Sequence, residues 1–166
     1  VGTAAVQVAK HFVGARVIAT TSSRDKAGKV GRLGADEVVV YTEEDVKDRV
    51  LELTEGRGVD VVVDHVGADF WPDAYSSLAE GGRYGICGVT SGYRAEFQMG
   101  LLFTRQQTVF GVYMGRTEDL RQIVQTVERG TLRAVIHEIF PLEEAAEAHS
   151  TMEAREFFGK LVLTVP

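Results

Sequence analysis

Residues 1–10 have the composition of a glycine turn that leads directly into a helix. Ala4, Ala5 and Val8 give this helix an apolar stripe at helical spacing. Gly2 lets the start of the helix lie close to a strand and to a phosphate, and the free N–H groups of the first turn would then face the anion. We interpret the segment as the closing half of a dinucleotide-binding fingerprint, whose opening half, a strand and the earlier glycines, is missing from the sequence.

Metal ligands at the usual spacing are not visible in the sequence. The histidines are scattered at His11, His65, His137 and His149, and Cys87 is the only cysteine. No Cys-x-x-Cys pair exists, and no two histidines have ligand spacing. We therefore predict no metal site in this chain.

Other catalytic arrangements are also not apparent, including a nucleophile elbow, a phosphate-cleaving loop and a pair of catalytic carboxylates. Asp60 and Asp64 alternate along one predicted strand and are expected to share a face. We interpret them as caps of neighbouring helices or turns rather than as an acid and a base. The sequence therefore assigns no catalytic residue.

The elements that position these residues alternate between strand and helix along the chain. The run Val59–Asp64 is almost entirely β-branched, which predicts a strand buried on both faces. The alternation predicts right-handed βαβ units and an α/β fold of the Rossmann type, a doubly wound parallel sheet with helices on both faces and with the first strand missing. The strands are predicted at residues 15–21, 37–41, 59–64, 83–88, 108–114, 135–140 and 160–165.

The regular alternation ends near residues 130–135. We predict a dinucleotide-binding domain over residues 1–132 and a separate C-terminal segment over residues 133–166. The missing first strand would leave a gap between the strands at 15–21 and 59–64. We expect the C-terminal strand at 160–165, or a partner chain, to fill this gap.

Composition limits the classes of partner. The chain has 166 residues and a formal net charge of −6, which argues against a nucleic-acid surface and gives no reason to expect a membrane surface. Its apolar runs are far too short to span a bilayer. A single cysteine excludes an internal disulfide and fits a reducing cytoplasm.

Five segments in order resemble the cofactor half of the medium-chain dehydrogenases/reductases, which include zinc alcohol dehydrogenases and zinc-free quinone oxidoreductases. The segments are VGTAAVQ (1–7), LGAD (33–36), GVDVVVD (58–64), GGR (81–83) and FGKLV (158–162). The resemblance covers nearly the whole chain. It implies that a catalytic half with the substrate pocket, and with zinc in some members, is absent here, that the C-terminal segment returns to that half, and that this part alone is inactive.

The resemblance also implies a choice of cofactor. In members that bind NAD, an acidic residue at the end of the second strand binds the ribose 2′-hydroxyl, and Thr21 has this position here. Residues matching Ser22, Lys26 and Tyr41 line the pocket in quinone reductases that use NADPH, and Arg24 also suits a 2′-phosphate. We expect NADP(H) rather than NAD(H). The alternative is that the serines only cap the next helix and that the two basic residues are solvated.

Two further segments resemble those that lie along the nicotinamide and its ribose, at the ends of the strands 59–64 and 83–88. His65 lies where it could touch the ribose, although a histidine at a strand end is more often hydrogen-bonded within the fold. The predicted cofactor-binding residues are Val1, Gly2, Thr21, Ser22, Ser23, Arg24, Lys26, Tyr41, Val66, Gly67, Gly88 and Val89.

The favoured function is hydride transfer from NADPH to a small-molecule substrate, a quinone or an activated alkene. A zinc-dependent alcohol dehydrogenase is the nearest alternative, and a non-catalytic nucleotide-binding module is another. A methyltransferase is disfavoured, because it would need an acidic residue at Thr21 to hold ribose hydroxyls. The apolar, uncharged strand from Thr108 to Met114 predicts a homodimer that joins two sheets edge to edge, as in the family.

Overall fold

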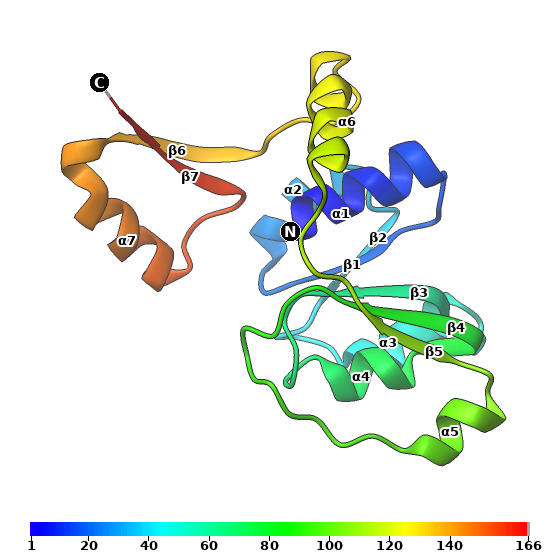
Figure 1. Cartoon of the computed structure of the whole chain (residues 1–166). Coiled ribbons are helices and arrows are strands. Elements are labelled where there is room, and N and C mark those ends of the chain that lie inside the picture. Colours follow the sequence, from blue (N-terminus) through cyan, green and yellow to red (C-terminus); the bar gives the residue numbers. More distant parts are fainter. Residues whose placement is uncertain (166) are drawn as a thin grey trace.

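The computed structural model describes residues 1–165, along which strands and helices alternate from α1 to β7 (Figure 1). The strands are β1 (Ile18–Thr21), β2 (Glu37–Val40), β3 (Val59–Asp64), β4 (Leu78–Ile86), β5 (Thr108–Gly111), β6 (Ile136–Pro141) and β7 (Lys160–Thr164). The α-helices are α1 (Gly2–Val8), α2 (Arg24–Gly31), α3 (Val46–Leu53), α4 (Trp71–Ser76), α5 (Met99–Thr104), α6 (Thr117–Glu128) and α7 (Ala145–Ala154). A π-helical turn, Ala9–Val13, continues α1, and a 3-10 turn, Leu142–Glu144, precedes α7.

All pairs of named strands within residues 1–165 are parallel. β1 pairs with β2, β4 lies between β3 and β5, and β6 pairs with β7. Helices α3 and α4 lie on one side of the β3–β4–β5 sheet, and α1 and α6 lie on the other side of the molecule (Figure 1). The predicted α/β fold of the Rossmann type, with parallel strands and helices on both faces, is confirmed.

The predicted gap in the sheet is present. Within the described residues β1 pairs only with β2, and β3 pairs only with β4. The expectation that the C-terminal strand fills this gap is wrong, because β7 pairs with β6 and places Leu163 opposite Phe140. One helix joins β6 to β7, so the two strands form a βαβ unit of their own. A partner chain in the gap stays a prediction.

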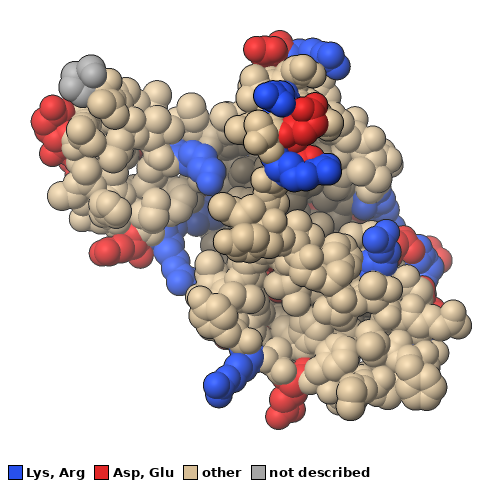
Figure 2. Space-filling model, viewed as in Figure 1, with Lys and Arg blue, Asp and Glu red and all other residues tan. Residues whose placement is uncertain are grey.

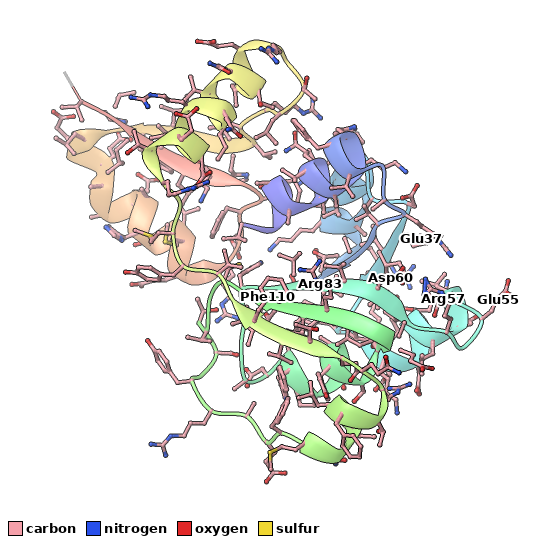
Figure 3. The ribbon with its side chains drawn as sticks, turned by 45° about the vertical axis from the view of Figure 1, so that its right-hand side comes forward. Glu37, Glu55, Arg57, Asp60, Arg83 and Phe110 are labelled. Carbon is pink, nitrogen blue, oxygen red and sulfur yellow. The ribbon has the colours of Figure 1, made fainter. Side chains whose placement is uncertain are left out.

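The two faces of β3 differ in burial, contrary to the expectation from its β-branched sequence. Val62 is buried against α4, whereas Val61 is 56% and Val63 54% exposed. The covering helices α3 and α4 pack on one face only, and the opposite face is open. Arg83 and Phe110 lie on this open face, with the guanidinium 5.4 Å from the ring centroid (Figure 3).

Aromatic side chains dominate the core beneath the β3–β4–β5 sheet. Trp71 and Tyr75 of α4 stack with ring centroids 4.8 Å apart, and both rings pack against Tyr84 of β4. A second cluster joins α1 and α2 to β1, and a third joins α3 to β2. These contacts fix the strand ends relative to the helices that follow them.

The element boundaries follow local capping and strand length. Ser23 and Asp45 accept hydrogen bonds from backbone N–H groups of the first turns of α2 and α3. Each is an N-cap, and the helix begins at the residue that follows it. β5 ends at Gly111, earlier than the predicted end at Met114. Its partner β4 ends at Ile86, whose carbonyl accepts a last hydrogen bond from Val112. No helix within residues 1–165 has the length and apolarity needed to cross a bilayer.

Candidate functional site

The carboxyl ends of β1 and β2 lie side by side. Thr21, the last residue of β1, is buried, and its carbonyl accepts a hydrogen bond from the N–H of Tyr41 at 3.0 Å. The hydroxyl of Thr42 donates to the carbonyl of Ser22 at 2.9 Å. Three predicted site residues, Thr21, Ser22 and Tyr41, are therefore neighbours at one edge of the sheet.

The first turn of α2 supplies polar groups at the same edge. The Ser23 hydroxyl accepts from the N–H of Lys26 at 3.4 Å, as expected of a helix cap. Lys26 Nζ donates to the carbonyl oxygen of Arg155 at 2.8 Å. Lys26 is thus directed toward the turn after α7, a neighbour that sequence reasoning missed.

The charged neighbours of this turn are partly neutralised. Arg24 forms an ion pair with Glu43 at 2.5 Å, and its side chain is 83% exposed. The carboxylate of Asp25 accepts from Lys29 Nζ at 2.7 Å, one helical turn further along. This hydrogen bond and the charge of Lys29 lower the pKa of Asp25 below its ordinary value. Asp25 is therefore ionised at neutral pH but engaged within α2.

Asp64 orders the turn that follows β3. It is 1% exposed and accepts hydrogen bonds from the N–H groups of Val66, at 2.7 Å, and Gly67, at 3.2 Å. The Tyr84 hydroxyl donates to the same carboxylate at 3.0 Å. Burial, and next the charge of Asp64, raise the pKa of Tyr84, so the phenol stays protonated. The interpretation of Asp64 as a turn cap is confirmed.

Asp60 differs from Asp64 in both face and function. Its carboxylate forms a bidentate pair with the guanidinium of Arg57 in the preceding turn (Figure 3). It is exposed, and it lies where the pairing register shifts, between Val59 and Val61. The expectation that Asp60 and Asp64 share a face, and that both are caps, is wrong for Asp60.

The loops after β3 and β4 pack closely on each other through glycines. Gly67 has a φ of +94°, and a Cβ there would lie 2.8 Å from the carbonyl oxygen of Gly92 and from Cα of Val89. A Cβ on Gly88 would lie 2.8 Å from the carbonyl oxygen of His65. Val66, Gly67, Gly88 and Val89 therefore lie together. The contact between the loops is itself enough to require glycine at both positions.

The start of α1 lies beside the end of β3. The position of a Cβ on Gly2 is 3.6 Å from Nε2 of His65, which is an ordinary van der Waals contact. Val1 is exposed. Burial lowers the pKa of His65 below its ordinary value of 6.5, so the imidazole is neutral at pH 7. His65 thus faces the helix terminus at which an anion would be held.

Cavities mark two places in the described residues. A small one of about 70 Å³ lies at the ends of β3 and β4 and is lined by Asp64, Gly67 and Val89, among others. The larger one, of about 480 Å³, includes Gln7, His11 and Arg32 and lies near the carboxyl ends of α1, α2 and α6. The larger cavity is not the candidate site, because none of the predicted cofactor-binding residues lines it. No group of three or more His, Cys, Asp or Glu side chains within residues 1–165 is placed to hold a metal ion.

Comparisons with known proteins place these features in context. A family model described as zinc-binding dehydrogenase matches residues 1–129. The quinone oxidoreductase of Pseudomonas aeruginosa is 36% identical over 172 residues, which cover 98% of this chain and 53% of that protein. The crystal structure of an NAD-dependent alcohol dehydrogenase is 44% identical, with a TM-score of 0.91 over 99% of this chain and 48% of the other.

A further solved structure, crotonyl-CoA carboxylase/reductase AntE (V350A) in complex with NADP, is 25% identical with a TM-score of 0.91. The match covers 99% of this chain and 46% of that one. The chain therefore spans about half the length of the relatives that it matches.

Proposed function

We propose that this chain, which belongs to the zinc-binding dehydrogenase family of oxidoreductases, is the NADP(H)-binding half of an enzyme that reduces a quinone or an activated alkene. The family is that of the medium-chain dehydrogenases/reductases. Its members named above include a quinone oxidoreductase, an alcohol dehydrogenase and a crotonyl-CoA carboxylase/reductase. The substrate and the preference for NADP(H) are the parts of the proposal that need experiment.

The observation that carries the cofactor choice is the set of groups at the carboxyl end of β1. Thr21 takes the position where a carboxylate would hold a ribose 2′-hydroxyl and repel a 2′-phosphate. The neighbouring groups are hydroxyl, N–H and ammonium donors from Ser22, Ser23 and Lys26, and donors of this kind fit a phosphate. The nearest carboxylate in sequence, Asp25, is bound by Lys29.

The relatives do not decide between the two cofactors. One solved structure is that of an NAD-dependent dehydrogenase, and another contains NADP. The preference therefore rests on the residues of this chain.

The cofactor, when bound, supplies the hydride, and the chain supplies binding and orientation. The N–H groups at the start of α1, near Gly2, face the place of the diphosphate and have no acceptor within the helix. The turn that Asp64 holds positions Val66 and Gly67 at the nicotinamide end. Neutral His65 adds no charge beside the helix terminus.

A fluorescence titration of this chain with NADPH and, separately, NADH tests the proposal. We expect NADPH to bind roughly tenfold more tightly than NADH, because the 2′-phosphate of NADPH would form hydrogen bonds and a charge pair that NADH cannot form. Tighter binding of NADH would overturn the cofactor assignment. Binding of neither would contradict a cofactor site formed by this chain alone, while leaving membership in the family intact.

A zinc-dependent alcohol dehydrogenase is the second candidate, because the matching family model is described as a zinc-binding dehydrogenase and the 44% identical neighbour as an alcohol dehydrogenase. Metal analysis of the full-length protein separates the two. Stoichiometric zinc, with oxidation of an alcohol, would replace the quinone reductase assignment.

We also propose a homodimer through β5. Within residues 1–165 this strand pairs on one side only, with β4. Beyond its end the side chains of Val112, Tyr113 and Met114 are 49%, 92% and 80% exposed. An apolar strand with one free edge favours pairing with another copy. Light scattering at micromolar concentration should give twice the mass of the chain, and a monomer would contradict the proposal.

A further inference from the structure

The larger cavity, of about 480 Å³, lies where α1, α2 and α6 end, and basic residues contribute to its lining. These are Arg32, directly after α2, Arg133, after α6, and His11, in the π-helical turn that continues α1. The hydroxyl-bearing Thr131 also lines it, and no Asp or Glu within residues 1–165 does. A volume of several hundred Å³ is typical of sites for small organic ligands.

A buried glutamine fixes the backbone of Arg133 at the wall of this cavity. Gln7 of α1 is 3% exposed, and its side-chain Oε1 accepts a hydrogen bond from the Arg133 N–H at 3.1 Å. Its Nε2 donates to the carbonyl oxygens of Arg133, at 3.2 Å, and of Thr3, at 2.9 Å. One buried amide therefore ties α1 to a segment 126 residues away, and the Arg133 side chain extends from a fixed position.

The two arginines of the cavity have no carboxylate partner. Over α6, basic and acidic side chains lie side by side, as in the ion pair of Arg121 with Glu118 (Figure 2). Arg32 and Arg133 are exposed, and no ion pair within residues 1–165 includes either of them. In a chain with a net charge of −6, two unpaired guanidinium groups at one cavity mark a local site for negative charge.

The helix ends do not account for these positive charges. Basic side chains near a helix C-terminus can interact with its last, unpaired carbonyl groups. At the end of α6, however, the N–H of Gly130 donates to the carbonyl of Val127 at 2.9 Å. The N–H of Thr131 donates to the carbonyl of Thr126 at 3.2 Å, and the N–H of Leu33 closes the end of α2 in a similar way. Backbone donors thus occupy these carbonyl groups, which leaves the guanidinium groups to an external anion.

A phosphate ester fits these groups better than a carboxylate does. A guanidinium binds either anion through two parallel hydrogen bonds. A phosphate monoester has three terminal oxygens and close to two negative charges at neutral pH, so it can accept from donors on different helices at once. The Thr131 hydroxyl and the His11 imidazole are further donors of the lining. The apolar side chain of Leu33 leaves a part of the cavity for the uncharged group of the ester.

We propose that this cavity binds a small phosphate ester through Arg32 and Arg133, with Thr131 and His11 as additional donors. The site is separate from the proposed cofactor pocket, which lies at the other end of α1. Residues 2–13 form α1 and its π-helical turn, and at 1.5 Å per residue the two ends are roughly 16 Å apart. The chain then has room for a second anionic ligand beside the cofactor. This inference goes beyond the proposed function and does not depend on it.

NMR titration of the isotope-labelled chain with glycerol 3-phosphate tests the proposal residue by residue. The backbone amides of Gly130 and Thr131 report on the cavity, and those of Gly2 and Ser23 report on the cofactor pocket. Glycerol, which lacks the phosphate, and succinate, a dicarboxylate, are the comparison ligands.

Arg32→Gln and Arg133→Gln each remove one guanidinium from the cavity. Arg129→Gln is the matched control, because Arg129 is the C-cap residue of α6 and does not line the cavity. All three variants should keep the wild-type melting temperature, since each replaces an exposed side chain that forms no ion pair.

We expect glycerol 3-phosphate to shift the amide signals of Gly130 and Thr131 until the site is saturated, and glycerol to leave them unchanged. Arg32→Gln and Arg133→Gln should each weaken binding roughly tenfold, because each loses a charged, bidentate contact. Arg129→Gln should bind like the wild type. Succinate should bind roughly tenfold more weakly than glycerol 3-phosphate.

Four results would overturn the proposal. Signals of Gly130 and Thr131 that do not move, or shifts confined to Gly2 and Ser23, would show that the cavity binds no phosphate. Unchanged affinity in Arg32→Gln and Arg133→Gln would exclude the two arginines as ligands. An equal loss in Arg129→Gln would assign the effect to the general charge of the surface. Succinate that binds as tightly as glycerol 3-phosphate would overturn the assignment to a phosphate ester.

Discussion

The hydrogen bond from Tyr84 to Asp64 holds the turn that faces the nicotinamide end of the proposed site. Tyr84 is completely buried, and its hydroxyl donates to Asp64 Oδ2 at 3.0 Å. The same carboxylate accepts from the backbone N–H groups of Val66 and Gly67. Tyr84→Phe removes one of these donors and keeps the ring in the core, so it tests the hydrogen bond with little change in packing.

The expected cost follows from the charge and the burial of the acceptor. A hydrogen bond to a charged group contributes about 1.5–3 kcal/mol, so Tyr84→Phe should lower the free energy of unfolding by about 2 kcal/mol. For a chain of this size that loss corresponds to a decrease in melting temperature of roughly 4–8 °C. The buried carboxylate is left with backbone donors alone.

Tyr75→Phe is the matched control in the same cluster. The Tyr75 ring stacks on Trp71, and its buried hydroxyl has no hydrogen-bond partner within residues 1–165. Removing an unpaired buried hydroxyl should leave stability unchanged or raise it. Urea unfolding can be followed by the fluorescence of Trp71, the single tryptophan of the chain. Equal destabilisation of the two variants, or none in Tyr84→Phe, would refute the reasoning.

Three further substitutions test the site. Gly67→Ala places a Cβ 2.8 Å from the Gly92 carbonyl oxygen at a φ of +94°, so thermal unfolding should show a loss of about 3 kcal/mol; a wild-type melting temperature would contradict the close packing. Thr21→Asp introduces a carboxylate where a 2′-phosphate is proposed, and the ratio of NADPH to NADH affinity should fall roughly tenfold or more in a fluorescence titration. Burial lowers the pKa of His65 in the folded chain below the 6.5 of the unfolded chain. Below pH 6.5 the unfolded chain therefore binds more protons than the folded one, so the free energy of unfolding falls as the pH drops. His65→Gln should flatten this part of a plot of melting temperature against pH from 5 to 8, and an unchanged slope would exclude His65 as its source.

Local sequence signals predicted the elements that have local causes. The β-branched run of β3 gave the observed bounds, Val59–Asp64, since a glycine turn precedes it and the side chain of Asp64 starts the next turn. The end of β5 was misplaced because it depends on β4: once β4 stops at Ile86, the chain after Val112 has no partner strand. Strand length is thus set by the neighbour as well as by propensity.

The partner of β7 and the two faces of β3 depend on tertiary contacts that no local pattern contains. Valine at 61 and 63 favours an extended backbone, but burial also needs a helix to cover that face. The helices α3 and α4 cover only the face of Val62. The continuous apolar run therefore predicted the strand correctly, but it predicted burial of both faces, and only one face is buried.

The glycines and charged residues of the candidate site also depend on tertiary contacts that the local sequence does not contain. Gly67 and Gly88 are predicted to bind the cofactor, and in the structure the space that a side chain would take at each position is filled by the backbone of the adjoining loop. Arg24 was assigned to the phosphate by its place in the chain, but its guanidinium is paired with Glu43. The Lys26 ammonium donates to the backbone carbonyl of Arg155, which lies 129 residues further along the chain. Residue type thus identifies what a site can bind, whereas the contacts between distant segments determine which charges are left to bind it.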